Sequence, residues 1–397
     1  MKKQIAISLS HRIVTIINGI FVTALVAKYI GGDLYGNFAY LSSLALIFGT
    51  ALQFGAQTQL QSELSKYYHK NKKLENLLYH NFSVRIVLAF VIVSATVSYL
   101  VAHHYSKYLI TLIAILIASK VFEPIRTIKD FRLRSDSYLV PEITIILLFS
   151  LIKIYLIKNE VNSNAILLLL FLELCTLRLV DVYLTYTSNN FLLTKTKNKK
   201  LKKSYKRIKS AFPYFIISIA SIGAMRIDQV MLFNLATSSA TADYAIAVKL
   251  AEGFLSITTA ILLVTSQKIL HHKTDSQYVR KQFYAFTIVA TFIAILVGVL
   301  TPNLILLLYG SEYHGTLLPF WILLTIVPLN VISTFNYMTL IRQRSSQRLM
   351  IRTVAIVTLN IAFNIAFIPK FGAAGAAAAT VLPDLAIITF FYRYKRN

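Results

Sequence analysis

Cysteine and charged residues are scarce in this chain of 397 residues. A single cysteine, Cys175, rules out an intrachain disulfide, and no Cys/His cluster has the spacing of a zinc site. Charged residues make up only 14%, against about 25% in typical soluble domains. With 56% hydrophobic residues and a mean hydropathy of +0.62, this composition excludes the common soluble globular classes.

Acidic residues are the scarcer of the two signs, 16 against 41 Lys and Arg, which gives a net charge of +25. Such an excess is common in nucleic-acid-binding proteins. Here, however, the basic residues lie in short connectors between apolar stretches. The positive-inside rule for membrane proteins accounts for that arrangement without a ligand, so we expect no nucleic-acid partner.

Apolar stretches of about 20 residues or more recur along the chain, which is the length that a helix needs to cross a bilayer. We therefore predict an all-α polytopic membrane protein with about twelve transmembrane helices. The expected crossings are 5–30, 34–61, 82–102, 108–128, 139–158, 164–188, 210–236, 242–267, 283–302, 314–341, 350–369 and 373–393.

Basic residues concentrate in every second connector and at the two termini. Thirty Lys and Arg lie on that side, and the opposite connectors hold only Lys28, Lys107, Lys158 and Lys370. This asymmetry predicts that both termini are cytoplasmic and that the number of crossings is even. The longest basic connector, 195–209, follows the sixth crossing. We therefore predict a six-helix bundle over 1–194, a polybasic cytoplasmic linker over 195–209 that faces lipid headgroups or solvent, and a second six-helix bundle over 210–397.

Ionisable residues inside the expected crossings are the main functional candidates, because a charge near the bilayer centre is costly. They are Arg12, Arg85, Lys120, Glu123, Glu142, Lys153, Glu173, Arg178, Asp181, Arg226, Asp228, Lys249, Glu252 and Asp384. Three pairs have the i, i+3 spacing that places two side chains on one helix face: Lys120/Glu123, Arg178/Asp181 and Lys249/Glu252. The first two favour structural pairing near helix ends or snorkelling, and the third favours a water-filled cavity. Arg85, close to a basic connector, is expected to snorkel.

Several of these cations have no acidic residue at a local pairing distance. Arg226 and Asp228 are two residues apart, so they point to different helix faces and each needs a partner from elsewhere or access to water. Arg12 and Lys153 also lack a local acid. Such cations fit an aqueous cavity that accepts anions, so we predict Arg12, Lys153, Arg226 and Lys249 as substrate-binding residues.

The intramembrane acids have two possible roles. Asp228, Glu252 and Glu173 can accept a coupling proton or sodium ion, or can position a neighbouring cation. No arrangement typical of a hydrolase, a metal centre or a phosphate loop occurs, so we expect no catalytic residue, no metal and no cofactor. The run 371–380 is rich in Gly and Ala and predicts a helix face for close packing.

Several stretches resemble the polysaccharide (O-antigen) flippases, the Wzx-type branch of the multidrug/oligosaccharidyl-lipid/polysaccharide exporter superfamily. They are Tyr29-Ile-Gly-Gly-Asp-Leu-Tyr-Gly-Asn-Phe-Ala-Tyr40 with Phe54-Gly55, Arg226-Ile-Asp-Gln-Val-Met-Leu232, Asp243-Tyr-Ala-Ile-Ala-Val-Lys-Leu-Ala-Glu252 and Leu308-Tyr-Gly-Ser-Glu-Tyr313. The family usually has Gly at the position of Asp243, so this chain departs from the pattern there.

The resemblance implies two six-helix bundles around a central cavity that opens alternately to each side of the bacterial cytoplasmic membrane. The implied substrate is an undecaprenyl-pyrophosphate-linked oligosaccharide, such as an O-antigen repeat for lipopolysaccharide. The implied partners are this lipid-linked oligosaccharide, membrane lipids, a proton or sodium ion, and the polysaccharide polymerase and chain-length machinery. The alternatives are a drug or cation exporter of the same superfamily and a membrane polysaccharide polymerase. The polymerase is disfavoured because such enzymes usually carry a sizeable loop, whereas the outward connectors here are short.

Overall fold

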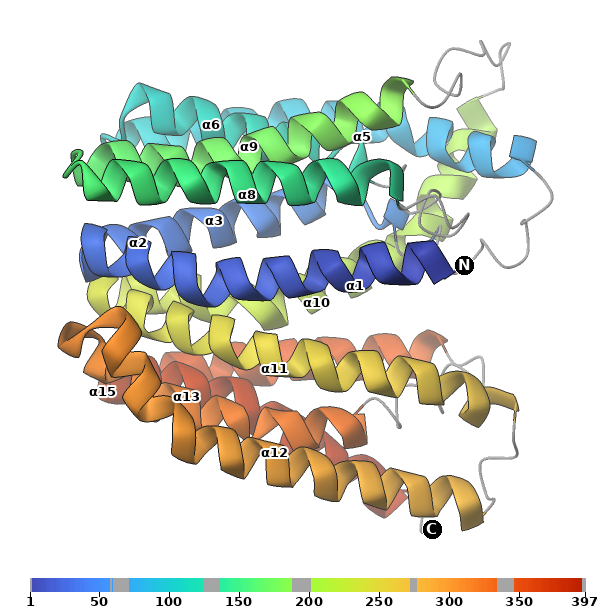
Figure 1. Ribbon diagram of the computed structural model, residues 1–397. Helices are drawn as coiled ribbons and strands as arrows, with labels where there is room; N and C mark the ends of the chain where they lie inside the picture. Colours follow the sequence, from blue (N-terminus) through green and yellow to red (C-terminus); the bar gives the residue numbers. More distant parts are fainter. Residues whose placement is uncertain are drawn as a thin grey trace. The chain divides into compact units, whose positions relative to one another are not determined.

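A computed structural model of the chain describes residues 2–57, 59, 71–123, 136–187, 201–271, 277–333 and 346–394. These residues form helices, turns and no strand (Figure 1). The predicted all-α polytopic membrane fold is confirmed. The basic connectors predicted for the cytoplasmic side fall largely on the gaps between these ranges, so most of them lie outside the described residues.

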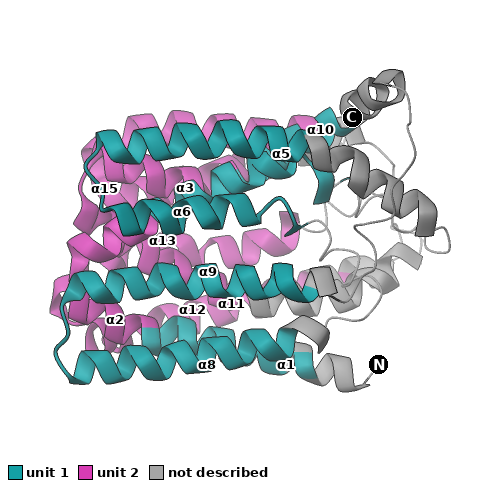
Figure 2. Ribbon diagram, turned by 90° about the horizontal axis from the view of Figure 1, so that it is seen from above, with its two compact units in different colours: residues 1–22, 41–222 teal, residues 23–40, 223–397 magenta. Residues whose placement is uncertain are grey.

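The chain forms two compact units that are not contiguous in sequence (Figure 2). Unit 1 comprises residues 1–22 and 41–222, and unit 2 comprises residues 23–40 and 223–397. Residues 23–40, which the sequence places in the first bundle, therefore pack within unit 2. The proposed division into bundles at 195–209 stays a prediction. Within that segment, residues 201–209 are helical and form the start of α10.

Unit 1 is built from neighbouring helices that pack in series. Helix α1 contacts α8, α8 contacts α9, α9 contacts α6, and α6 contacts α5 (Figure 1). The helices are α1 (Lys2–Ile17), the π-helix η1 (Asn18–Val22), α5 (Asn71–Ala102), α6 (Lys107–Ser119), α8 (Asp136–Lys158) and α9 (Ser163–Thr187), with most of α3 (Gly32–Gln53) and the first part of α10 (Leu201–Leu235).

Unit 2 contains the remaining helices, with α13 in contact with α11, α12 and α15 and with α2 against α12. Its elements are α2 (Thr23–Ile30), α11 (Ser238–His271), α12 (Gln277–Tyr309), the 3-10 helix η2 (Ser311–Thr316), α13 (Leu317–Leu324) and α15 (Ser346–Tyr394). The start of α3 and the end of α10 also belong to it.

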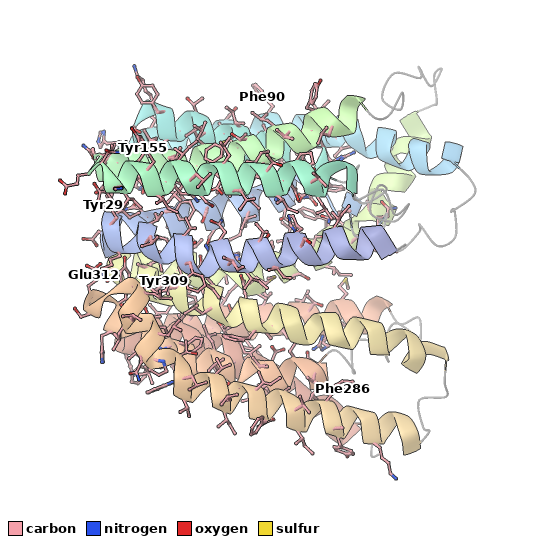
Figure 3. The ribbon with its side chains drawn as sticks, in the orientation of Figure 1. Tyr29, Phe90, Tyr155, Phe286, Tyr309 and Glu312 are labelled. Atoms are coloured by element: carbon pink, nitrogen blue, oxygen red, sulfur yellow. The ribbon has the colours of Figure 1, made fainter. Side chains whose placement is uncertain are left out.

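Every predicted crossing overlaps described helix, and the ends of 34–61, 108–128 and 314–341 lie outside the described residues. The eleventh and twelfth crossings both lie in α15, which is interrupted at Gly372 by a non-helical backbone conformation. In the described part of the chain, seven helical stretches are long and apolar enough to cross a membrane. Large apolar side chains cover the outer surface of both units, among them Phe90 on α5, 78% exposed, and Leu307 on α12, 77% exposed (Figure 3). Such exposure is stable in acyl chains but not in water.

The Ala-rich run after Gly372 forms a close-packed helix face within unit 2, as predicted. Ala376, Ala377 and Ala379 are fully buried, and α15 packs against α11 and α13. Small side chains let helix backbones approach closely, which matters in a membrane because lipid tails compete with every apolar contact.

Two glycines of the flippase-like motifs are required by close backbone contacts. In unit 2, a Cβ on Gly36 would fall on the carbonyl oxygen of Ser238, at the start of α11. In unit 1, Gly55 has a φ of 68°, and its Cβ would fall on the backbone nitrogen of Phe215. Because both obstacles are backbone atoms, no side-chain rotation relieves them.

We expect Gly36→Ala to destabilise unit 2 by about 2 kcal/mol, because the added methyl must separate α3 from α11. The measurement is thermal unfolding of the purified protein in detergent. Gly223→Ala is the matched control, since the nearest atom to its Cβ is 3.9 Å away. Equal melting temperatures for the two variants would contradict this account of Gly36.

Candidate functional site

Arg226 of α10 and Glu252 of α11 form an ion pair inside unit 2. The Nη2 of Arg226 lies 3.1 Å from Oε1 and 3.3 Å from Oε2 of Glu252. Arg226 has no acidic partner at a local spacing in the sequence. Its partner, Glu252, comes from the next helix. Arg226 is nine residues before the end of α10, which places it about 14 Å along the helix axis from that end, near the middle of a crossing.

Lys249 of α11 lies three residues before Glu252 and contacts a third helix. Its Nζ donates a 2.7 Å hydrogen bond to Oγ1 of Thr23 on α2. Two contacts between helices are present here, Lys249 with Thr23 and Glu252 with Arg226. These four residues, contributed by α2, α10 and α11 of unit 2, are called the cation cluster below.

The cation cluster is half-buried and retains an unsatisfied donor. The side chains of Arg226 and Glu252 are 20% and 37% exposed. The Nε of Arg226 is itself buried and has no hydrogen-bond partner among the residues that the structure describes. Two cations and one carboxylate leave the cluster with a net positive charge. A buried N–H without an acceptor costs free energy, so this site favours an additional anion.

Asp228 points into a second, fully buried polar group of unit 2. Its carboxylate accepts hydrogen bonds from the hydroxyl of Tyr244, from Oγ1 of Thr380 at 3.1 Å and from the backbone N–H of Gln229 at 2.8 Å. As the sequence indicated, Asp228 and Arg226 find separate partners. Tyr244 and Thr380 come from α11 and α15, so three helices meet at this carboxylate.

Two asparagines of α15 form a further set of buried hydrogen bonds in unit 2, and sequence reasoning missed them. The Nδ2 of Asn360 donates to the carbonyl of Ala379 at 3.1 Å, and Nδ2 of Asn364 donates to Oδ1 of Asn360 at 3.0 Å. Oδ1 of Asn364 is buried without a hydrogen-bond partner in the described residues. The signal was present in the sequence, because two amides in an apolar crossing need polar partners.

Lys153 of α8 is paired with Glu173 of α9 in unit 1, at 2.8 Å between Nζ and Oε2. The interpretation of Lys153 as an uncompensated cation is therefore wrong. The two side chains are only 4% and 9% exposed. The pair differs from Arg226–Glu252 in its burial, and it links two neighbouring helices of the unit.

Glu123 is the centre of a charged network in unit 1. Lys120 donates to its Oε2 at 2.7 Å, Arg178 lies 3.2 Å from its Oε1, and Gln53 of α3 donates to it as well. The predicted pairs Lys120/Glu123 and Arg178/Asp181 are both present, the second at 3.9 Å. The structure adds the contacts between helices that join α3, α6 and α9.

Arg85 does not snorkel, contrary to the sequence-based expectation. Its side chain is fully buried, and its Nη1 donates a 2.6 Å hydrogen bond to the carbonyl of Val121. The carbonyl is exposed to a donor because the chain leaves α6 there in turns. The side chain of Arg12 lies outside the described residues. Glu142, for which no partner was predicted, lies 3.0 Å from Nε2 of His11.

Solved structures with the same arrangement of helices are transporters. The chain aligns along its whole length with 88% of a structure described as the lipid II flippase MurJ in an inward closed conformation, with a TM-score of 0.71 and 14% identity. It also aligns with an inward-facing multidrug resistance MATE family transporter of the MOP superfamily, with a TM-score of 0.60, 12% identity, and 98% and 97% of the two chains covered. The chain has the fold of the MOP superfamily transporters.

An outward-facing MATE family transporter of the MOP superfamily gives a TM-score of 0.55 at 14% identity, with 99% and 92% of the two chains covered. No protein-family model and no curated protein matches the sequence. The MOP fold is therefore shared at identities that establish architecture alone, and the role of each charged residue must be argued from this chain.

The burial of the Lys153–Glu173 pair predicts how the unit responds to substitution. We expect Lys153→Ala to destabilise the protein by about 3–5 kcal/mol, because it leaves the Glu173 carboxylate buried and unpaired. The double variant Lys153→Met/Glu173→Leu should recover most of that loss. The measurement is the unfolding free energy or, for irreversible unfolding, the melting temperature in detergent. A stable Lys153→Ala protein would instead place Lys153 at a solvated site.

Proposed function

We propose that this protein is a flippase that moves an undecaprenyl-pyrophosphate-linked oligosaccharide across the bacterial cytoplasmic membrane by alternating access. The observation that carries this proposal is the cation cluster. Arg226 and Lys249 lie near the middle of membrane crossings and are half-buried, and Glu252 is the one carboxylate within the cluster. A lipid diphosphate needs such groups, because its charge must be stabilised on its way through hydrocarbon.

The guanidinium and ammonium groups suit different parts of this task. The planar fork of Arg226 can donate two parallel hydrogen bonds to phosphate oxygens, and its unsatisfied Nε–H is one of the donors available. Lys249 acts as a point charge on a flexible stem, and its Nζ donates to the neutral hydroxyl of Thr23. Arg12 completes the proposed substrate-binding set from the sequence. Lys153, paired with Glu173, is proposed to support the fold of unit 1.

The similarity to two kinds of transporter supports transport in general and leaves two substrates to compare. One similar structure is described as a lipid II flippase and another as a multidrug resistance transporter. A cationic drug would meet electrostatic repulsion from Arg226 and Lys249 unless it displaced them, whereas an anionic lipid headgroup is attracted. The charge of the cation cluster therefore favours the lipid-linked substrate over a cationic drug.

Neutralising the cation cluster should stop transport without unfolding the protein. We expect Arg226→Gln and Lys249→Gln each to lower the rate of lipid transfer at least tenfold, because one charged contact to a phosphate contributes about 1.5–3 kcal/mol. The measurement is transfer of a fluorescent lipid-linked oligosaccharide between the leaflets of proteoliposomes. In cells, the same variants should lose surface polysaccharide at normal protein levels.

Lys158→Gln is the matched control for these variants, because Lys158 is an exposed cation at the end of α8. It removes the same charge outside the cluster and should transport at the wild-type rate. Normal transfer by both cluster variants would remove Arg226 and Lys249 from the mechanism.

We further propose that Asp228 carries the coupling cation, a proton or a sodium ion. Its carboxylate lies among oxygen atoms of Tyr244 and Thr380. Hard cations such as sodium prefer oxygen ligands, and a buried carboxylate can alternatively take a proton.

Asp228→Asn should separate coupling from substrate binding. The amide keeps the size of the side chain and most of its hydrogen bonds but removes the charge that a cation needs. We expect a lipid-transfer rate that no longer responds to an imposed proton or sodium gradient, with substrate affinity close to wild type. Separate pH and sodium gradients across the proteoliposomes identify the ion. A variant that responds to both gradients as the wild type does would exclude Asp228 from coupling.

A further inference from the structure

The contact between Arg226 and Glu252 leaves one donor of the guanidinium unused. Both oxygens of Glu252 lie near the same nitrogen, Nη2, at 3.1 and 3.3 Å. The Nε–H, which is the second donor on that edge of a guanidinium, has no acceptor in the described residues. A carboxylate that matched this edge would bind both nitrogens in parallel.

Glu252 is also more exposed than the acids of the other buried pairs. Its side chain is 37% exposed, against 9% for Glu173 and 17% for Glu123. Glu173 and Glu123 have their cations at 2.8 and 2.7 Å. Of Glu252, Glu173 and Glu123, the acid that faces the proposed substrate-binding cation therefore has the most exposed side chain and the greatest freedom to leave its partner.

We propose that Glu252 is a stand-in anion, which compensates Arg226 in the substrate-free protein and is displaced by the phosphate of the substrate. This inference rests on the proposed function. A cation without a counter-charge is costly inside a membrane, so an empty substrate site needs an anion of its own. A phosphate offers more oxygens than a carboxylate and can occupy Nη2 and Nε together, which removes the unsatisfied donor.

The sequence gives Glu252 a second partner once it has left Arg226. Lys249 precedes it by three residues on α11, so the two side chains share a helix face. Lys249 now bonds to the hydroxyl of Thr23 at 2.7 Å, a neutral acceptor that a carboxylate can replace. When the phosphate of the substrate displaces Glu252 from Arg226, Glu252 can pair with Lys249. Its carboxylate is then not left without a counter-charge.

The test measures binding of farnesyl pyrophosphate, a short diphosphate lipid, to the full-length protein in nanodiscs by titration calorimetry. Removing a competing anion should tighten binding, so we expect Glu252→Gln to lower the Kd roughly tenfold, within the usual range of couplings between two ligands of one site. Glu252→Asp keeps the charge on a shorter side chain and should bind with an intermediate affinity. Glu160→Gln, at an exposed position of unit 1, is the charge-matched control and should bind as the wild type does.

A double variant and an uncharged lipid complete the design. In an Arg226→Gln background, Glu252→Gln should no longer tighten binding, because the competition is for Arg226. Farnesol, which has the same chain and no phosphate, should not distinguish Glu252→Gln from wild type. If Glu252→Gln does not fold, Glu252→Asp alone decides, since the inference requires it to bind more tightly than wild type.

The outcomes separate this inference from the function on which it rests. If Arg226→Gln binds farnesyl pyrophosphate as well as the wild type does, the headgroup site itself is wrong. If Arg226→Gln loses binding while both Glu252 variants bind no more tightly than wild type, the site is correct and Glu252 is not a stand-in. The stand-in role is also overturned if Glu252→Gln tightens the binding of farnesol as much as that of farnesyl pyrophosphate. The same holds if it tightens binding equally in the Arg226→Gln background.

Discussion

A charge inside hydrocarbon is stable only beside an opposite charge or a polar group that replaces its hydration, and this constraint determines the interior of both units. In unit 1, Lys153 meets Glu173 and the buried Arg85 meets a backbone carbonyl. In unit 2, Asp228 is surrounded by hydroxyls and a backbone N–H, and Arg226 meets Glu252. Each of these contacts links two helices or a helix to a turn. The one exception is the hydrogen bond from the N–H of Gln229 to Asp228, which lies within α10. Charge compensation is therefore a large part of what fixes neighbouring helices to one another.

The sequence predicted those features that depend on neighbouring residues. Crossings follow from the local density of apolar side chains, and their described parts lie in or overlap helices. The pairs Lys120/Glu123 and Arg178/Asp181 follow from spacing on one helix and are present. Contacts between helices were not predictable, because spacing within a chain does not indicate which faces meet in three dimensions. Lys153 looked unpaired for that reason, although Glu173 lies only twenty residues away.

The flippase-like motifs have a structural explanation that sequence reasoning did not provide. The segment around Gly36 meets the start of α11 at Ser238, whose hydroxyl bonds to Asp33. In the motif that ends at Tyr313, the hydroxyl of Tyr313 donates a 2.7 Å hydrogen bond to the carbonyl of Ala27 on α2. These motifs converge on one end of unit 2, where α2, α3, α11 and η2 meet. They specify a packed corner of the fold, so the resemblance they carry concerns architecture more than substrate.

The departure from the family pattern at Asp243 belongs to the same corner and shows how a charge is accommodated there. Its Oδ1 accepts a 2.9 Å hydrogen bond from the buried Thr316, and its Oδ2 occupies the space that a Cβ on Gly315 would need. Asp243 thus has a hydrogen-bond donor in η2 and packs closely against it. Arg226 is the opposite case, with a half-exposed partner and a donor that remains unsatisfied. Within unit 2, the unsatisfied donor of Arg226, rather than its position in the membrane alone, is what supports its proposed role in binding.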